Sequence, residues 1–487
     1  MSNQSEIKPI AHKLFSEDWG KEPEPKLGNK PILGDRYTSK KFMELEWEKL
    51  WTKVWQVAGL EQQLENPGDF FTFDFGPESI LCAKGEDLKI RCFYNVCQHR
   101  GNQLVQIEEG NLESFDCAYH AWKFGLDGEL KWVPDEEDFL QGSPCGKRNL
   151  VPIKTEIWQG FIFFNLDPKC KPLREYLSPI MEHLEDYPIS DMIRTHWVSV
   201  EGDWNWKCVQ DNFNESYHTR FVHPQVPSVI DQDHFTSRYE MFPKGHARVI
   251  QMGRPSLRDR VAEDEDHPFK GILEDWGVDT SKYKDYETLS DQGWIDLKKA
   301  KRKNYKEKGY HHYENLSDEE LTESPFQFIF PNIAMGVQAD GCILLNWFPH
   351  PTDPEKCYFD LWDMGYPIGG SAKGIGKTGR DTDEEFKSTS AGIGETGRTS
   401  NQEYFSRTKV NPIILQEVEL DFRDYDNGKG VEDLWDHVVY QDWQLTDGLR
   451  RGVRSRGYQE PYLASQETRV RFFHEKLHDY LNGNPPK

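Results

Sequence analysis

Two short stretches of this sequence decide its fold: NVCQHRG at residues 95–101 and DCAYHAW at residues 116–122. They arrange four metal-binding side chains as C-x-H, seventeen residues, C-x2-H, namely Cys97, His99, Cys117 and His120. A Rieske [2Fe-2S] cluster takes two cysteine thiolates on one iron and two histidine imidazoles on the other. Two loops that each supply one cysteine and one histidine meet this need, so the spacing predicts a Rieske cluster.

A single zinc ion is the main alternative, because mixed cysteine and histidine ligation also suits tetrahedral zinc. Structural zinc sites usually take two cysteines from one short motif and two histidines from another. Here each loop carries one residue of each type, which favours the iron–sulfur cluster.

The sequence around these loops divides into three parts. Residues 47–170 contain short strands and turns such as DFFTFDF and GFIFFNL, which predict a small antiparallel β domain. Residues 171–487 alternate between strand and helix patterns, with a helix expected over 438–481, and strands enclosed by helices predict an α+β domain. Residues 1–46 are expected to pack on this second domain.

Two stretches of the second domain do not fit the pattern of a compact core. Residues 255–324 are densely charged, and residues 366–402 are rich in glycine, serine and threonine, so both are interpreted as insertions. The second stretch contains GIGKTGR but lacks a preceding strand. A phosphate-binding loop is therefore not expected there.

Composition excludes several classes of partner. The chain has 487 residues and a net charge of −24, which argues against nucleic acid, because neutralising phosphates requires a basic surface. No run approaches the roughly 18 apolar residues of a membrane span, and the N-terminus has no apolar export segment. The other seven of its nine cysteines are scattered without a disulfide framework. We therefore expect a cytoplasmic protein.

A second group of metal-binding residue types occurs in DNFNESYHTRFVHP, residues 211–224. If this stretch is helical, Asp211, Glu215 and His218 share one face. His223 precedes Pro224, where a helix should end, so its side chain can approach the same point. Two histidines and a carboxylate form the facial site of non-haem Fe(II) oxygenases. A partly exposed surface helix is the alternative.

The chain resembles the α subunit of the Rieske non-haem iron oxygenases, the family of aromatic-ring-hydroxylating dioxygenases and related monooxygenases. The resemblance rests on the cluster loops and on Asn205-Trp206-Lys207 followed by two histidines. It implies an antiparallel sheet wrapped by helices, in a helix-grip-like arrangement, and iron ligation by His218, His223 and Asp442. Without the resemblance, the residues alone leave Asp436 and Asp447 equally open.

The resemblance also implies roles for two neighbouring residues. Glu215 matches the carboxylate that links the cluster histidine of one subunit to an iron-ligating histidine of the next, and Asn212 matches a pocket residue near the iron. Ala118 and Ala121 replace the usual proline and glycine around His120, and Gln98 replaces a common arginine. These departures leave the ligands intact.

The implied activity is that of a terminal oxygenase, which uses O2 and electrons from a separate reductase or ferredoxin to hydroxylate a hydrophobic, ring-containing substrate. The family also implies a homotrimer, with or without a β subunit. The apolar pocket wall is expected to include Phe328, Phe330, Met335 and Leu344. Two alternatives stay open: a monooxygenase acting on a quaternary ammonium compound, to which Glu215 points, and an electron carrier without oxygenase activity.

Overall fold

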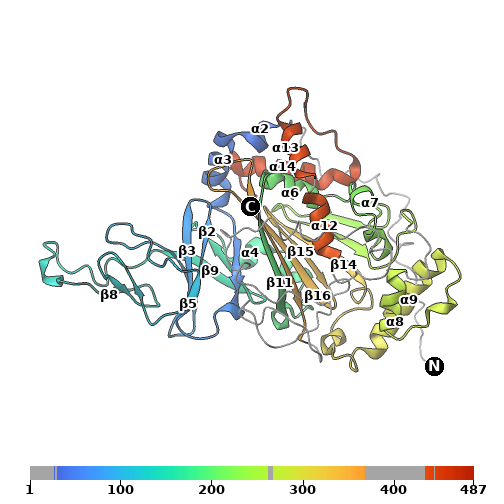
Figure 1. Ribbon diagram of the computed structural model, residues 1–487, viewed down its shortest axis with the longest axis horizontal. Coiled ribbons are helices and arrows are strands. Elements are labelled where there is room, and N and C mark those ends of the chain that lie inside the picture. Colours follow the sequence, from blue (N-terminus) through green and yellow to red (C-terminus); the bar gives the residue numbers. More distant parts are fainter. Residues whose placement is uncertain (1–26, 28–29, 261–266, 368–433, 444, 487) are drawn as a thin grey trace.

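The computed structural model of the protein describes residues 27, 30–260, 267–367, 434–443 and 445–486. All but the first two residues of the glycine-rich stretch 366–402 lie outside this part. Within it, the chain builds two adjacent β-sheet domains flanked by helices (Figure 1).

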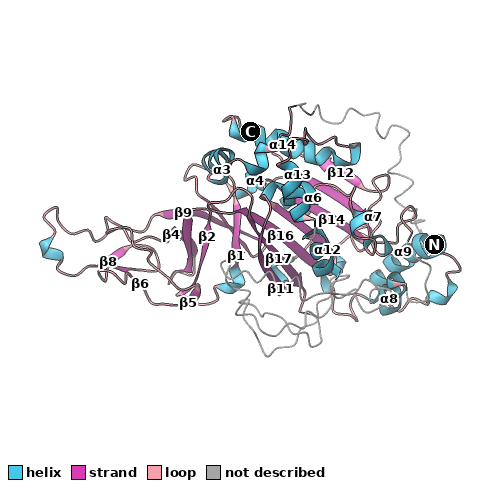
Figure 2. Ribbon diagram, turned by 45° about the horizontal axis from the view of Figure 1, so that its top comes forward, coloured by secondary structure: helices cyan, strands magenta, loops and turns pink. Residues whose placement is uncertain are grey.

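The first domain contains a seven-stranded antiparallel sheet. Its strands in spatial order are β1 (Gln56–Leu60), β10 (Phe161–Asn165), β9 (Pro152–Trp158), β4 (Ile90–Tyr94), β3 (Glu78–Lys84), β2 (Asp69–Phe75) and β5 (Glu109–Asn111). A three-stranded sheet projects beyond it at one end of the molecule, formed by β6 (Phe115–Asp116), β7 (Lys123–Phe124) and β8 (Leu130–Trp132) (Figures 1 and 2). The two cluster loops adjoin this small sheet.

The second domain is built on another seven-stranded antiparallel sheet. Its strands in spatial order are β11 (Ile193–Gly202), β17 (Cys357–Gly365), β16 (Gly341–Pro349), β15 (Ile333–Gln338), β14 (Glu323–Ile329), β13 (Ala247–Met252) and β12 (Arg238–Met241). Every residue of β16 is buried. Both faces of the central strands are therefore covered, which explains their continuous apolar sequence.

Helices cover the two faces of this sheet. One face packs against α6 (Trp206–Phe213), α12 (Leu434–Trp443) and α14 (Thr468–Leu481), and the other against α4 (Leu173–Leu177), α5 (Ile180–His183), α8 (Pro268–Asp275) and α9 (Tyr286–Asn304). Short flanking helices are α2 (Asp35–Thr38), α3 (Lys40–Glu46), α7 (Thr219–Val222) and α13 (Thr446–Val453). The predicted α+β fold, an antiparallel β domain beside a sheet wrapped by helices, is confirmed.

The expectation that residues 255–324 lie outside the compact core is wrong for residues 267–324. Helix α9 buries Trp294 and Leu297 in the core on one face of the large sheet. Its lysines are compatible with burial because the Lys298 ammonium lies 3.7 Å from the ring centre of Trp294 and Lys301 pairs with Asp340. Long side chains thus cover apolar surface while their charges keep partners.

The predicted helix over 438–481 is interrupted. Helix α13 ends at Val453, and α14 begins at Thr468, with an extended connection between them that ends in a short 3-10 turn. The connection contains Gly457 and Pro461, and both residue types disfavour a helix interior.

The N-terminal residues that are described pack on the second domain. Asn205 caps α6 by accepting a hydrogen bond from the backbone N–H of Lys207. Lys207 Nζ forms a buried ion pair of 2.7 Å with Glu46 at the end of α3, and Trp206 Nε1 donates to the same carboxylate. The motif Asn205-Trp206-Lys207 therefore starts a helix and also anchors the N-terminal segment. None of the described helices has the length and apolar character needed to span a membrane.

Candidate metal centres

The two cluster loops are tight turns that bring their four candidate ligands together. In the first loop the N–H of Gly101 donates to the carbonyl of Cys97, and in the second the N–H of Ala121 donates to the carbonyl of Cys117. The rings of His99 and His120 lie 4.6 Å apart between centres. The thiols of Cys97 and Cys117 are buried neighbours.

These donors fit a two-iron cluster. Burial and the adjacent Cys117 thiol raise the pKa of Cys97 to about 11, so thiolates here need a strong positive charge beside them. The Nδ1 atom of His99 is buried without a hydrogen-bond partner. The donor group that could hold a single metal ion among the described residues includes none of these four side chains, which favours the cluster over tetrahedral zinc.

In the second loop, Ala121 replaces the family's usual glycine, and this replacement costs conformational free energy. Ala121 has φ of 55°, in the left-handed region that glycine adopts without strain. The family's usual glycine fits this turn better by about 1 kcal/mol. The turn nevertheless forms, with the N–H of Cys117 donating to the carbonyl of Trp122.

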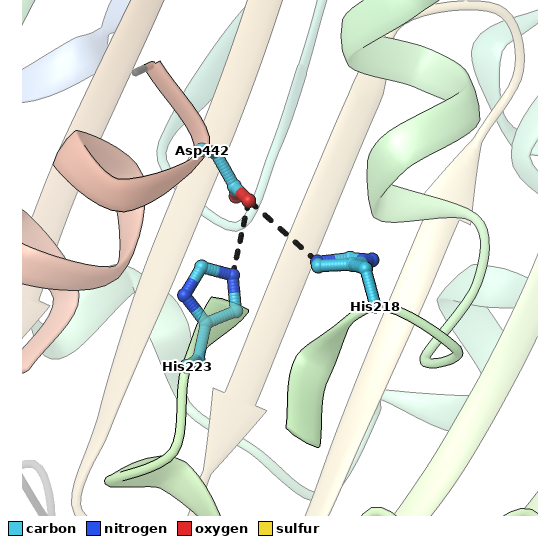
Figure 3. A group of neighbouring side chains, drawn as sticks. All are labelled: His218, His223 and Asp442. Atoms are coloured by element: carbon cyan, nitrogen blue, oxygen red, sulfur yellow. Dashed lines mark ion pairs between the residues drawn. The ribbon is translucent and has the colours of Figure 1, made fainter. Parts of the chain in front are cut away.

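A second set of donors converges beside the large sheet. His218, His223 and Asp442 each offer one ligand atom, and these atoms lie within 4.8 Å of one another (Figure 3). Oδ1 of Asp442 is 3.0 Å from Nε2 of His223 and 3.6 Å from Nε2 of His218. Two imidazoles and one carboxylate thus face a common point.

The local structure that places these residues differs from the helical face expected from the sequence. Helix α6 ends at Phe213, before Glu215 and His218, so Asp211 does not share a face with them. Asp211 instead accepts hydrogen bonds from Tyr37 at 2.6 Å and from His474 at 3.0 Å. His218 and His223 cap the two ends of the short helix α7.

Hydrogen bonds fix the orientation of both histidines. Nδ1 of His218 donates to the Glu215 carboxylate, and Nδ1 of His223 donates to Oε1 of Gln441 at 2.7 Å. Burial lowers the pKa of His218, but the hydrogen bond and charge of Glu215 outweigh it, and the pKa is raised overall. With Nδ1 protonated on each ring, both Nε2 atoms point their lone pairs at Asp442.

This group fits a single metal ion. Nε2 of His223 and Oδ1 of Asp442 are buried, yet neither has a hydrogen-bond partner of acceptable geometry, although they are 3.0 Å apart. Unsatisfied buried polar atoms are costly, and a shared cation removes the cost for both. Asp447, by contrast, is exposed, and its carboxylate pairs with Arg450.

A cavity opens beside the triad. Its walls include the rings of Phe213, Phe326 and Phe328 and the polar side chains of Asn212, Glu215, Gln232, Gln251 and Arg469. Nδ2 of Asn212 is buried without a hydrogen-bond partner. Gly336 lies opposite Phe326 in the sheet, where a side chain would collide with that ring.

Of the four apolar residues expected in the pocket wall, only Phe328 is there. Met335 pairs with Gln327 and Leu344 pairs with Met335, so both lie on the opposite face of the sheet from Phe328. Phe330 lies beyond the end of β14 and packs on Phe473 and Tyr480. The error arises because strands buried on both faces carry apolar residues at every position, so the sequence does not reveal which face lines the pocket.

Sequence reasoning missed two residues of the site. Gln441 holds His223, and its only signal is its position next to Asp442. Arg469 lines the cavity, and its signal is a basic residue on the apolar side of the amphipathic helix α14.

The fold and the two donor sets define a class of protein: iron-dependent oxygenases that join an iron–sulfur domain to a mononuclear iron domain. Family models agree. Residues 54–150 match the Rieske [2Fe-2S] domain, and residues 189–364 and 421–483 match the catalytic domain of the ring-hydroxylating alpha subunit. The chain belongs to the Rieske non-haem iron oxygenase alpha subunits, whose two domains bind a Rieske [2Fe-2S] cluster and a mononuclear iron. The expected family and cofactors are confirmed.

Individual relatives are more distant. The chain is 33% identical over 201 residues to the carnitine monooxygenase oxygenase subunit of Escherichia coli (strain K12), which covers 41% of this chain and 54% of that protein. It is 33% identical over 186 residues to the large oxygenase component of the naphthalene 1,2-dioxygenase system of Pseudomonas putida, covering 37% and 41%. The matches thus span about half the length of these relatives.

The fold also matches a solved structure. A quaternary ammonium Rieske monooxygenase superposes with a TM-score of 0.61 at 19% identity, covering 96% of this chain and 98% of that chain. At this identity the match concerns the fold.

Proposed function

We propose that this protein is the terminal oxygenase component of a multicomponent system and that it oxidises a small quaternary ammonium compound. The observation that carries the proposal is the two-histidine, one-aspartate group facing a cavity with three phenylalanine rings. The relationship to carnitine monooxygenase supports this substrate class ahead of the hydrophobic ring compound expected from the sequence.

In this proposal Cys97, Cys117, His99 and His120 hold the cluster, and His218, His223 and Asp442 hold the iron. When bound, the cluster supplies electrons one at a time and the iron activates O2. The chain itself orients the ligands: Glu215 and Gln441 keep each imidazole in the tautomer that presents Nε2.

The cavity wall suits a cation. The rings of Phe213, Phe326 and Phe328 offer π faces, which attract a quaternary ammonium group that cannot donate hydrogen bonds. The same rings would also pack against an aromatic substrate, which is the second candidate and is supported by the relationship to naphthalene dioxygenase.

Electrons must come from another protein, because no flavin or nicotinamide motif was found in the sequence. We propose a separate reductase or ferredoxin as the donor and a homotrimer as the assembly. The alternative of an electron carrier without oxygenase activity is not supported, because residues 189–364 and 421–483 match the catalytic domain of the ring-hydroxylating alpha subunit.

The decisive experiment is product analysis with the reconstituted holoenzyme, a compatible reductase, NADH and O2. Trimethylammonium compounds and naphthalene are supplied separately, and products are identified by mass spectrometry with 18O2. We expect oxygen-dependent conversion of a trimethylammonium compound. Conversion of naphthalene alone would favour the second candidate, and no conversion with intact reduction of the cluster would overturn both substrate classes.

Glu215→Gln is expected to lower turnover about 10- to 100-fold, the usual effect of removing a partner of a metal-ligating histidine. The amide keeps the size of the side chain but loses the negative charge that holds Nδ1 of His218. Iron content should be unchanged, which metal analysis checks. Glu113→Gln, at an exposed position in the first domain, is the matched control. Full turnover in Glu215→Gln would mean that Glu215 only stabilises the turn before α7.

A further inference from the structure

Arg469 is a buried cation in the wall of the candidate active-site cavity. It lies in the first turn of α14, and only 2% of its surface is exposed. It lines the same cavity as His218, His223 and Asp442.

Two aromatic rings lie close to its guanidinium, but two of its nitrogen atoms have no hydrogen-bond partner. The guanidinium carbon lies 4.7 Å from the ring centre of Phe328 and 5.0 Å from that of Tyr239. Its Nε and Nη1 atoms are buried without a hydrogen-bond partner. No carboxylate among the described residues forms an ion pair with it.

The nearby acidic residue is already engaged. The Glu215 carboxylate accepts hydrogen bonds from the backbone N–H groups of Tyr217 and His218 and from the His218 ring. Burial lowers the pKa of Arg469 to about 10, so the side chain stays charged at neutral pH. By contrast, Arg254, which is equally buried, pairs with both Asp231 and Asp291.

A buried, unpaired charge destabilises a fold unless a partner arrives. We propose that Arg469 binds a carboxylate group of the substrate, so that the substrate carries both an ammonium centre and a carboxylate. The N–H groups of a guanidinium donate strong, charge-assisted hydrogen bonds to a carboxylate. The aromatic wall receives the cation, and Arg469 receives the anion. This inference rests on the proposed function for the location of the substrate, and it adds the requirement that the substrate carries a carboxylate.

The test is isothermal titration calorimetry of the anaerobic holoenzyme with two matched pairs of compounds. Glycine betaine and choline share a trimethylammonium group and differ in the carboxylate, as benzoate and benzamide do on a phenyl ring. Arg469→Gln should weaken binding of the two carboxylates about 100-fold. Binding of choline and benzamide, which lack a carboxylate, should be unchanged or slightly tighter. Arg469→Lys, which keeps the positive charge but loses the planar guanidinium, should weaken carboxylate binding about 10-fold.

Arg471→Gln is the matched control, because Arg471 lies on the same helix and donates to the backbone of Lys30 outside the cavity. Circular dichroism and thermal unfolding check that each variant folds, and Arg469→Lys keeps the test valid if Arg469→Gln does not.

The outcomes separate this inference from the proposed function. Tight binding of benzoate but not glycine betaine, lost in Arg469→Gln, would support the carboxylate contact and overturn the quaternary ammonium substrate. Binding of choline equal to or tighter than glycine betaine, unaffected by Arg469→Gln, would overturn the contact and leave the substrate class standing. Failure of both carboxylates to bind the wild-type holoenzyme would also overturn the contact.

Discussion

Replacing His218 with alanine is expected to lower the iron content from about three atoms per chain to about two and to abolish substrate oxidation. The variant loses one of three donors that converge within 4.8 Å, and the remaining pair, His223 and Asp442, offers too few ligands to retain iron. The cluster loops lie in the other domain and make no use of His218, so the reduced cluster should keep its EPR signal.

Iron and acid-labile sulfide analysis with EPR, before and after nitric oxide treatment, measures this outcome. The high-spin iron-nitrosyl signal should vanish in His218→Ala, whereas it should persist in His311→Ala, an exposed histidine outside the site. Unchanged iron and undiminished turnover in His218→Ala would mean that the metal is held elsewhere.

Replacing Cys117 with alanine is expected to have the opposite pattern, with loss of about two irons and of acid-labile sulfide while the nitrosyl signal remains. Cys117 is buried beside Cys97, and a cluster held by thiolates on one iron does not survive with only one of them. Turnover supported by a reductase should fall below detection, because electrons no longer enter through the chain.

Cys145→Ala serves as the control, since Cys145 is half-buried in the same domain but outside the two loops. If the wild-type protein contained zinc in place of iron, and Cys117→Ala lost that zinc, the site would be the single zinc site considered from the sequence and not a Rieske cluster. Retention of the Rieske EPR signal in Cys117→Ala would show that another residue completes the cluster.

The parts of the site that the sequence predicted are those defined by local spacing. The cluster loops each contain their ligands within a few residues, and His218 and His223 flank one short helix. Asp442 needed the family resemblance, because only the tertiary fold brings α12 to α7. The expected helical face was wrong because α6 ends at Phe213, with Asn214 as its C-cap, before the chain reaches Glu215 and His218.

Other features depend on contacts that the sequence does not encode locally. Gln441 holds His223 across 218 positions of the chain. Met335 and Leu344 look like Phe328 in composition, and only the register of β14, β15 and β16 separates the two faces. The lysines of α9 suggested a solvated insertion, but in the structure Lys298 contacts an aromatic ring and Lys301 pairs with Asp340.

The placement of the small three-stranded sheet has a consequence for how activity scales with protein concentration. This sheet and its loops project from one end of the molecule, whereas α7 and α12 lie beyond the first large sheet (Figures 1 and 2). Within one chain, the cluster loops and the triad therefore lie on different sides of the first large sheet (Figures 1 and 2). In the homotrimer that we propose, a neighbouring copy would bring its cluster loops to the α7 side of this chain. If the proposed homotrimer carries electrons between copies, we expect the turnover per chain to fall on dilution that separates the copies, although each chain stays folded.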